Sequence, residues 1–175
     1  MEENKKEIIL EEIMVAYGNE LVRLAFNYVK DKENAKDVVQ NSFIKCYKNL
    51  GDFRNESSVK TWLYRITINE SKDYLRSWHH RKVQAKSFVQ EAAKSILPSA
   101  EDKVIKESDN HQIRQLIFSL PKSYREVIFL YYYKSLIMDE IAEVTGVNLN
   151  TVKTRLRRGK QKLKIMMEEA GIYEE

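Results

Sequence analysis

The chain has 175 residues, 43% of them apolar and 32% charged, with five glycines and two prolines, which favours a soluble, mainly helical protein of one domain or two small ones. No apolar run approaches the roughly 20 residues of a membrane span, and the N-terminus lacks the apolar segment of a secretory signal. We therefore expect a cytoplasmic protein without direct membrane insertion. One cysteine and three histidines, two of them adjacent, give no zinc pattern, so we expect no enzyme, no metal site and no cofactor.

Residues 1–81 are predicted to form a small helical domain. Two apolar stripes at helical spacing, separated by the polar sequence KDKEN, predict two helices within residues 13–50. Gly51 and the aspartate after it end the second of these helices. A third helix is expected from about Ser58 to Arg81.

The second predicted helix has a polar face opposite its apolar stripe. Val39, Phe43 and Cys46 belong to the stripe, which we interpret as core packing. The opposite face combines polar side chains with one isoleucine, which suits a protein contact, although single exposed aliphatic residues are also ordinary on protein surfaces. The residues of this outward face are Asp37, Gln40, Asn41, Ile44 and Lys48.

Two aromatic residues near the start of the third predicted helix lie on different sides of it. Trp62 shares one face with Leu63 and Ile66, so we interpret it as a core anchor rather than a platform on which a base stacks. Tyr64 lies on the opposite side with Ile68 and could pack against a neighbouring helix.

Residues 82–109 have no sustained apolar stripe and are read as a linker. Periodicity returns in residues 110–175, where IRQLIFSLP predicts a short helix that stops before Pro121 and the next helix has proline in its first turn. Two further helices follow around a tight turn. The fold class is therefore all-α, with two small helical domains joined by a flexible linker.

The last two helices have the spacing of a helix-turn-helix. Ala142 lies four residues before Gly146 and Val152 six residues after it; the small residue lets the helices approach, glycine takes the left-handed turn, and the aliphatic residue locks the second helix inward. Asn148 is placed to cap that second helix.

The second helix of this motif is strongly basic on its outer face. Residues 151–164 contain seven Lys/Arg and no acidic residue, so the helix repels itself and a polyanion would relieve that cost. A solvated basic face on a bundle helix is the alternative. If DNA is the partner, the outward Lys153, Thr154 and Arg157 point to base edges, and the flanking Arg155, Arg158 and Lys160 to phosphates.

Three segments in order along the chain resemble the extracytoplasmic-function (ECF) sigma factors of the sigma-70 family, which are bacterial transcription initiation subunits. They are ENAKDVVQNSFIKCYKNLGDFRN, SSVKTWLYRITINESKDYLR and LPKSYREVIFLYYYKSLIMDEIAEVTGVNLNTVKTRLRRGKQKL. The resemblance implies that residues 1–81 are sigma region 2, which binds core RNA polymerase and reads and melts the minus-10 element. Residues 110–175 are then sigma region 4, which reads the minus-35 element in duplex DNA.

The resemblance also assigns roles to individual positions. The DVVQ-type helix implies that the outward face of the second helix binds polymerase. The loop FRNESS implies a pocket for one base of the single-stranded minus-10 element, formed by Arg54, Asn55, Glu56, Ser57 and Ser58 with Asn69 nearby. Basic residues that follow the strand are Lys60, Arg65, Lys72, Arg76 and Arg81. The minus-35 residues are Asn150, Thr151, Lys153, Thr154, Arg155, Arg157, Arg158 and Lys160.

Two other functions remain open from the residues alone. A one-component helix-turn-helix regulator would use residues 1–81 to sense or dimerise and would bind duplex DNA without polymerase. An interaction adaptor would use the basic helix to bind an acidic protein. Neither explains the polar loop after Phe53. The resemblance further implies an anti-sigma factor as a partner.

Overall fold

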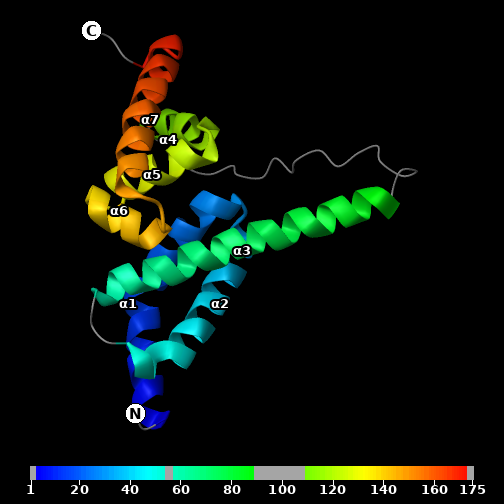
Figure 1. Cartoon of the computed structure of the whole chain (residues 1–175), viewed down its shortest axis with the longest axis vertical. Helices are drawn as coiled ribbons and strands as arrows, with labels where there is room; N and C mark the ends of the chain where they lie inside the picture. Colours follow the sequence, from blue (N-terminus) through cyan, green and yellow to red (C-terminus); the bar gives the residue numbers. More distant parts are fainter. Residues whose placement is uncertain (1–2, 54–56, 89–108, 173–175) are drawn as a thin grey trace.

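The structure, a computed structural model, describes residues 3–53, 57–88 and 109–172, and every regular element within these ranges is a helix. Helices α1–α3 form one bundle, and α4–α7 form a second bundle that rests on it (Figure 1). The predicted all-α fold of two helical domains is therefore confirmed. The elements are α1 (Glu3–Val29), α2 (Lys32–Asn49), the 3-10 helix η1 (Leu50–Asp52), α3 (Val59–Phe88), α4 (Asp109–Ser119), α5 (Lys122–Tyr132), α6 (Met138–Thr145) and α7 (Leu149–Glu169).

The turn between α1 and α2 falls where the sequence KDKEN predicted a break. Lys30 has a left-handed backbone with φ of 59°, and Asp31 caps α2 by accepting a hydrogen bond from the Asn34 amide at 2.8 Å. The turn folds α2 back along α1, so that their apolar stripes face each other. The buried side chains include Leu21, Leu24, Ala25 and Tyr28 from α1 and Val38, Val39, Phe43 and Cys46 from α2.

Helix α3 completes the first bundle. The Ser58 side chain caps it, because its Oγ accepts a hydrogen bond from the Thr61 amide at 3.0 Å. The buried face of α3 includes Leu63, Tyr64 and Ile68. The helix continues to Phe88, seven residues beyond the predicted end. The physical reason lies in residues 82–88, which contain no glycine or proline and several good helix formers.

The second bundle contains the helix-turn-helix where its spacing predicted it. Gly146 ends α6 with φ of 68°, and the Asn148 side chain caps α7 by accepting a hydrogen bond from the Asn150 amide at 2.9 Å. Val152 and Leu156 are buried in this domain, and Gly159 allows α7 to pass close to α5. The motif therefore has the geometry that the sequence required of it.

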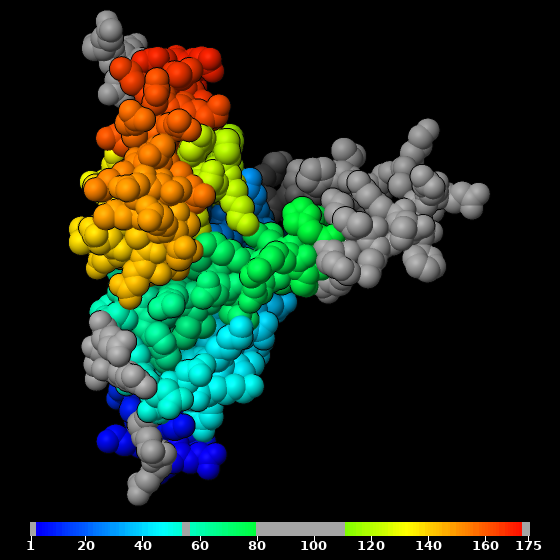
Figure 2. Space-filling view, in the orientation of Figure 1, coloured from blue at the N-terminus to red at the C-terminus, as the bar shows by residue number. Residues whose placement is uncertain are grey.

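The two bundles are packed against each other rather than held apart. Helix α6 lies against α3, and α5 meets α1; Figure 2 shows the second bundle seated directly on the first. One apolar contact at this junction joins the rings of Phe26 and Phe118, edge to face with centroids 5.7 Å apart. The junction also has polar contacts, in one of which Lys30 Nζ donates a hydrogen bond to the Phe118 carbonyl oxygen at 3.1 Å.

Candidate nucleic-acid interface

The outward face of α2 is a surface of the first domain. Every residue predicted for it is exposed: Asp37, Gln40, Asn41, Ile44 and Lys48. Ile44 keeps 48% of its surface accessible, while Val39 and Phe43 on the opposite side are buried. Next to this face, Lys45 forms an ion pair with Glu70 of α3, which ties the two helices together. The face therefore combines one exposed aliphatic side chain with hydrogen-bonding groups, as a protein-binding surface does.

A pocket of about 420 Å³ lies where the predicted base-reading loop meets α3. Arg54, Asn55 and Glu56 lie outside the described residues. Ser57 lines the pocket, and the Ser58 hydroxyl meets the Thr61 amide and hydroxyl as the helix cap. The other lining residues are Asn49, Asp52, Phe53, Trp62, Arg65 and Glu143. Of these, only Arg65 was predicted from the sequence.

Trp62 and Tyr64 of α3 lie in different environments. Trp62 is half-buried; its ring lies against Phe53 with centroids 4.7 Å apart, and both rings line the pocket. Tyr64 is fully buried and donates a hydrogen bond to Glu20 of α1. Burial and this carboxylate raise the pKa of Tyr64 well above its ordinary value. Tyr64 thus packs against a neighbouring helix, as its position allowed, and Trp62 both packs against the core and forms a wall of the pocket.

The residues of α3 that were predicted to contact the minus-10 strand differ in their exposure and in their partners. Arg65 and Asn69 are exposed on the outer side of the helix. Lys60 pairs with Glu20 at 3.2 Å, and Arg76 pairs with Asp73 one turn before it. The Arg81 side chain lies outside the described residues. Lys72 faces the second domain, where its Nζ lies 3.1 Å from Glu126 Oε1 and donates to the Thr145 carbonyl oxygen at 3.0 Å.

Helix α7 exposes the face that the sequence predicted. Lys153 and Arg157 are fully on the outside, and Thr154 is half-buried with its hydroxyl donating to the Asn150 carbonyl oxygen at 2.9 Å. Thr151, Arg158 and Lys160 are also exposed. Arg155 is turned toward α5, where its Nη1 lies 3.8 Å from Glu126 Oε2. Figure 1 shows α7 at the upper edge of the molecule, away from α1–α3 along most of its length.

A second pocket, of about 380 Å³, lies between the beginnings of α5 and α7. It gathers five of the eight predicted minus-35 residues: Asn150, Thr151, Thr154, Arg155 and Arg158. Ser123 and Tyr124 complete the lining, and the sequence analysis did not include them. Pro121 could have pointed to these two residues, because it marks the start of α5. Amides and hydroxyls at the start of a helix favour an anion.

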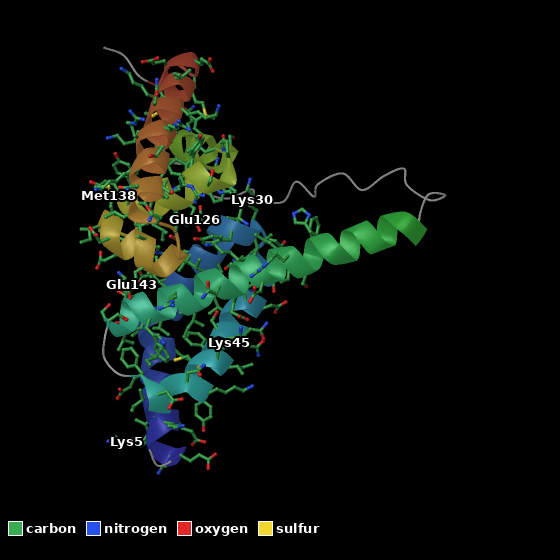
Figure 3. All side chains as sticks on the ribbon, in the orientation of Figure 1. Lys5, Lys30, Lys45, Glu126, Met138 and Glu143 are labelled. Carbon is green, nitrogen blue, oxygen red and sulfur yellow. The ribbon has the colours of Figure 1, made fainter. Side chains whose placement is uncertain are left out.

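Charged groups are buried between the two domains. Glu126 of α5 is only 5% exposed and lies at the junction shown in Figure 3, where Tyr28 Oη donates a hydrogen bond to its Oε1 at 2.9 Å. Burial, with the carboxylate beside it, raises the pKa of Tyr28 well above its ordinary value. At the other end of α5, the Lys134 side chain is 8% exposed and its Nζ lies 3.6 Å from Glu20 Oε1. Burial lowers the pKa of Lys134, and the nearby Glu20 carboxylate offsets only part of this decrease.

The described residues contain no group of three or more His, Cys, Asp or Glu side chains placed to hold a metal ion. Cys46 is buried in the first bundle, and burial raises the pKa of its thiol to about 11. In the described part of the chain, no helix has the length and apolar character needed to cross a membrane.

Two family models match the chain in order. The model described as Sigma-70 region 2 matches residues 13–81, and the model described as Sigma-70, region 4 matches residues 110–163. The first range includes the outward face of α2 and the pocket beside α3, and the second includes the helix-turn-helix. A match to both regions favours the sigma-factor interpretation over a one-component regulator or an adaptor.

Relatives of similar length match across both domains. The RNA polymerase sigma factor SigV of Bacillus subtilis is 32% identical over 151 residues, covering 86% of this chain and 86% of that protein. The ECF RNA polymerase sigma factor SigW of the same organism is 32% identical over 162 residues, with coverage of 87% and 86%. The ECF RNA polymerase sigma-E factor of Escherichia coli K12 is 31% identical over 160 residues, with coverage of 85% and 81%.

Solved structures share the fold. One is the sigma factor RpoE in complex with the anti-sigma factor NepR from Bartonella quintana, with a TM-score of 0.70 at 22% identity over 90% of this chain and 96% of that chain. Another is CnrH in complex with the cytosolic domain of CnrY, with a TM-score of 0.65 at 20% identity over 93% and 90%. The chain belongs to the sigma-70 family, as an alternative sigma factor of the ECF group that binds core RNA polymerase and directs promoter-specific transcription initiation.

Proposed function

We propose that three separate surfaces divide the work of this sigma factor. The outward face of α2 docks on core polymerase, the pocket beside α3 holds one base of the minus-10 element, and the outward face of α7 reads the minus-35 element. The observation that carries this assignment is the coincidence of exposure with chemistry on α7. Between residues 151 and 164 its exposed side chains are basic or polar and none is acidic, while Val152 and Leu156 on the opposite side are buried.

The polymerase-docking face is supported by Ile44. An isoleucine that keeps about half its surface in water gains free energy when a partner covers it, at roughly 25 cal/mol per Å² of apolar surface. Asp37, Gln40 and Asn41 surround it with groups that can form a polar rim. This arrangement suits docking onto another protein helix.

The minus-10 pocket is supported by its lining. Phe53 and Trp62 offer apolar ring surface to a base that has left the helical stack, and Ser57 and Asn49 offer hydrogen bonds to its edge. Arg65 on the rim suits the phosphate next to that base, and Asn69 is exposed one turn further along α3. Stacking on an aromatic ring contributes about 1–3 kcal/mol per base, which offsets the few kcal/mol needed to unstack it.

The assignment of α7 to the minus-35 element is supported by the separate positions of the residues that suit bases and those that suit phosphates. Lys153 and Arg157 project from the middle of the exposed face, where a recognition helix meets base edges in the major groove. Arg158, with Ser123 and Tyr124 across the 380 Å³ pocket, suits a backbone phosphate at the side of the groove. Base contacts would supply specificity, and phosphate contacts the register.

The domain limits, partners and setting follow from the same assignment. We infer that residues 1–81 act as region 2, residues 82–109 as the connection and residues 110–175 as region 4. Because RpoE and CnrH were solved with the anti-sigma factor NepR and with CnrY, we expect an anti-sigma factor to bind this chain as well. We expect the protein to act in the cytoplasm and to work by binding, without catalysing a reaction itself.

Promoter selection tests this function. Purified protein is added to core polymerase on a library of genomic fragments, and the run-off transcripts are sequenced. The expected result is initiation from a subset of fragments that share two short elements at a constant separation. Transcripts that do not depend on the added protein, or that share only one element, would show that the assignment of the α3 pocket and the α7 face to two promoter elements is wrong.

A further inference from the structure

Helix α1 carries an exposed apolar strip midway along its length. Its inner side is buried at Ile13 and Leu21. Towards the solvent, Val15 keeps 83% of its surface accessible and is the most exposed large apolar side chain among the described residues, while Met14 beside it keeps 47%. Val22 lies seven residues after Val15 and is half-buried. Seven residues is the repeat with which one helix packs along another.

Gly18 makes a hollow in this strip. Glu11, Met14, Val15 and Gly18 have the i, i+3, i+4, i+7 spacing of the four residues that surround one side chain of a partner helix, and together with Val22 they form the Gly18 surface. A Cβ built at Gly18 would meet nothing within 4 Å. Glycine weakens the middle of a helix, and here neither a left-handed backbone nor close packing within the described chain requires it. Close approach of a partner helix would require it.

The charges beside the Gly18 surface have one sign. Residues 7–22 contain four glutamates and no Lys or Arg, in a chain whose net charge is +4. Glu20 is turned inward, where Tyr64 donates a hydrogen bond to it. Glu11 and Glu12 are exposed and have no ion-pair partner among the described residues. Because these carboxylates repel phosphate groups and attract Lys and Arg, they favour a cationic protein segment over DNA or an anionic membrane.

The Gly18 surface is separate from the three surfaces assigned above. It belongs to a different helix from the outward face of α2, and none of its residues lines the pocket beside α3 or the pocket between α5 and α7. Figure 1 shows the first half of α1 extending away from α4–α7. The surface is therefore an additional one, and its test is independent of the proposed function.

We propose that the Gly18 surface of α1 docks a basic amphipathic helix of a protein partner. A large aliphatic side chain of that helix fills the hollow at Gly18, and its apolar neighbours cover Val15 and Met14. Lys or Arg residues beside its apolar stripe meet Glu11 and Glu12. In this mode, burial of apolar surface supplies affinity, and the complementary charges orient the partner.

The probe is a synthetic helical peptide of about three heptads, with leucine at the first and fourth positions of each heptad and lysine at the positions beside them. One comparison peptide has glutamate in place of lysine. A second keeps the composition of the lysine peptide in scrambled order, so that it has the charge without the apolar stripe. Fluorescence anisotropy measures binding of each monomeric peptide to the full-length protein at low and at high salt. We expect the lysine peptide to bind at least about tenfold more tightly than either comparison peptide.

Three substitutions in the full-length protein test which residues hold the peptide. Gly18→Val fills the hollow, Val15→Ser removes the most exposed aliphatic side chain, and Glu12→Lys reverses one charge. Ile165→Ser is the matched control, because Ile165 is also an exposed aliphatic residue within a helix but lies on α7. Helical content from circular dichroism checks that each variant is folded.

The variants are expected to differ in how salt affects them. Gly18→Val and Val15→Ser should weaken binding of the lysine peptide about tenfold at both salt concentrations, because they act on packing. Glu12→Lys should weaken it about fivefold at low salt and less at high salt, because salt screens exposed charges. Ile165→Ser should bind as wild type does. If all three substitutions match Ile165→Ser, or if the lysine peptide binds no better than its scrambled form, the proposal is refuted.

The oligomeric state decides whether the occupant is instead a second copy of the chain. Light scattering should give the mass of a monomer for the wild-type protein, since the glutamates beside two such surfaces repel each other. A wild-type dimer that Val15→Ser converts to a monomer would overturn the proposal in favour of self-association.

Discussion

Gly159 tests whether close packing of α7 on α5 positions the recognition helix. A Cβ built at Gly159 would lie 3.1 Å from Ile128 Cγ1 and 3.3 Å from Tyr124 Cβ. Both separations are shorter than the 3.5–4.0 Å at which carbon atoms attract most strongly, about the usual contact distance in protein interiors. Any side chain larger than a methyl group therefore has to push α7 away from α5.

The expected magnitude depends on the size of the new side chain. For Gly159→Ala, the helix gains about 0.8–1 kcal/mol of intrinsic propensity, and this offsets a tight contact that a small shift can relieve. Gly159→Val places two more carbons against Ile128 and Tyr124, and overpacking of this kind costs about 1–3 kcal/mol. We expect Gly159→Ala to be near neutral and Gly159→Val to destabilise the second domain, with weaker binding to minus-35 duplex DNA.

The assay can separate the two domains. Both tryptophans of the chain, Trp62 and Trp78, lie on α3, so their fluorescence follows the first domain while circular dichroism follows both. For Gly159→Val we expect urea to remove helical signal at a lower concentration with little change in the fluorescence midpoint. Gly18→Val is the matched control, because Gly18 is also within a helix and a Cβ there would meet nothing within 4 Å. Equal unfolding curves for Gly159→Val and Gly18→Val would refute the reasoning.

Two further predictions concern polymerase docking and pH. Ile44→Asp should weaken binding to core polymerase at least about tenfold, since it replaces apolar surface with a charge, whereas Ile8→Asp, at another exposed isoleucine, should not; equal effects in a competition binding assay would contradict this. Burial raises the pKa of Glu20, but hydrogen bonds from Tyr64 and Lys60 and the charge of Lys134 outweigh it, so the pKa lies below its ordinary 4.5. A carboxylate whose pKa is lowered in the folded state stabilises the fold at pH values above about 4.5. It loses that contribution as the pH falls through the pKa of the folded state. Melting temperatures should therefore fall less between pH 6 and pH 3 for Glu20→Gln than for wild type, and parallel curves would contradict the prediction.

Local features of the fold could be predicted because short-range physics determines them. The left-handed Gly146, the cap at Asn148 and the buried Val152 follow from spacing alone, and all three occur as expected. The outward face of α2 could be predicted equally well, because the 3.6-residue period of a helix places Ile44 and Phe43 on different faces. Helix ends were harder to predict. Helix α3 ran past Arg81 because nothing in the following residues stops a helix.

Helical periodicity could not predict how deeply Trp62 is buried. Residues at helical spacing share a face, but which face is more deeply buried depends on how the neighbouring helices cross. Helix α1 brings Glu20 to Tyr64, which makes the tyrosine side the interior. Trp62 packs against the core and against the Phe53 ring, but it also lines the pocket, so it remains half-buried.

The contact between the domains could not be predicted from the sequence. Tyr28 and Glu126 are 98 positions apart, and no local pattern relates an α1 tyrosine to an α5 glutamate. The same contact places two residues predicted to bind DNA, Lys72 and Arg155, in ion pairs with Glu126. Ser58 was predicted from the loop motif as a base contact, and in the structure its hydroxyl caps α3.

The separation of two reading surfaces is tested most directly by transcription with core polymerase on paired templates. Wild type, Arg157→Ala and Asn69→Ala are compared on one promoter and on versions with either the minus-35 or the minus-10 element scrambled. A well-made base contact contributes about 1–3 kcal/mol of discrimination, about tenfold or more in rate. Arg157→Ala should lose discrimination at minus-35 only, and Asn69→Ala at minus-10 only. Equal loss of transcription on all three templates from either change would contradict the account and indicate phosphate binding without sequence reading.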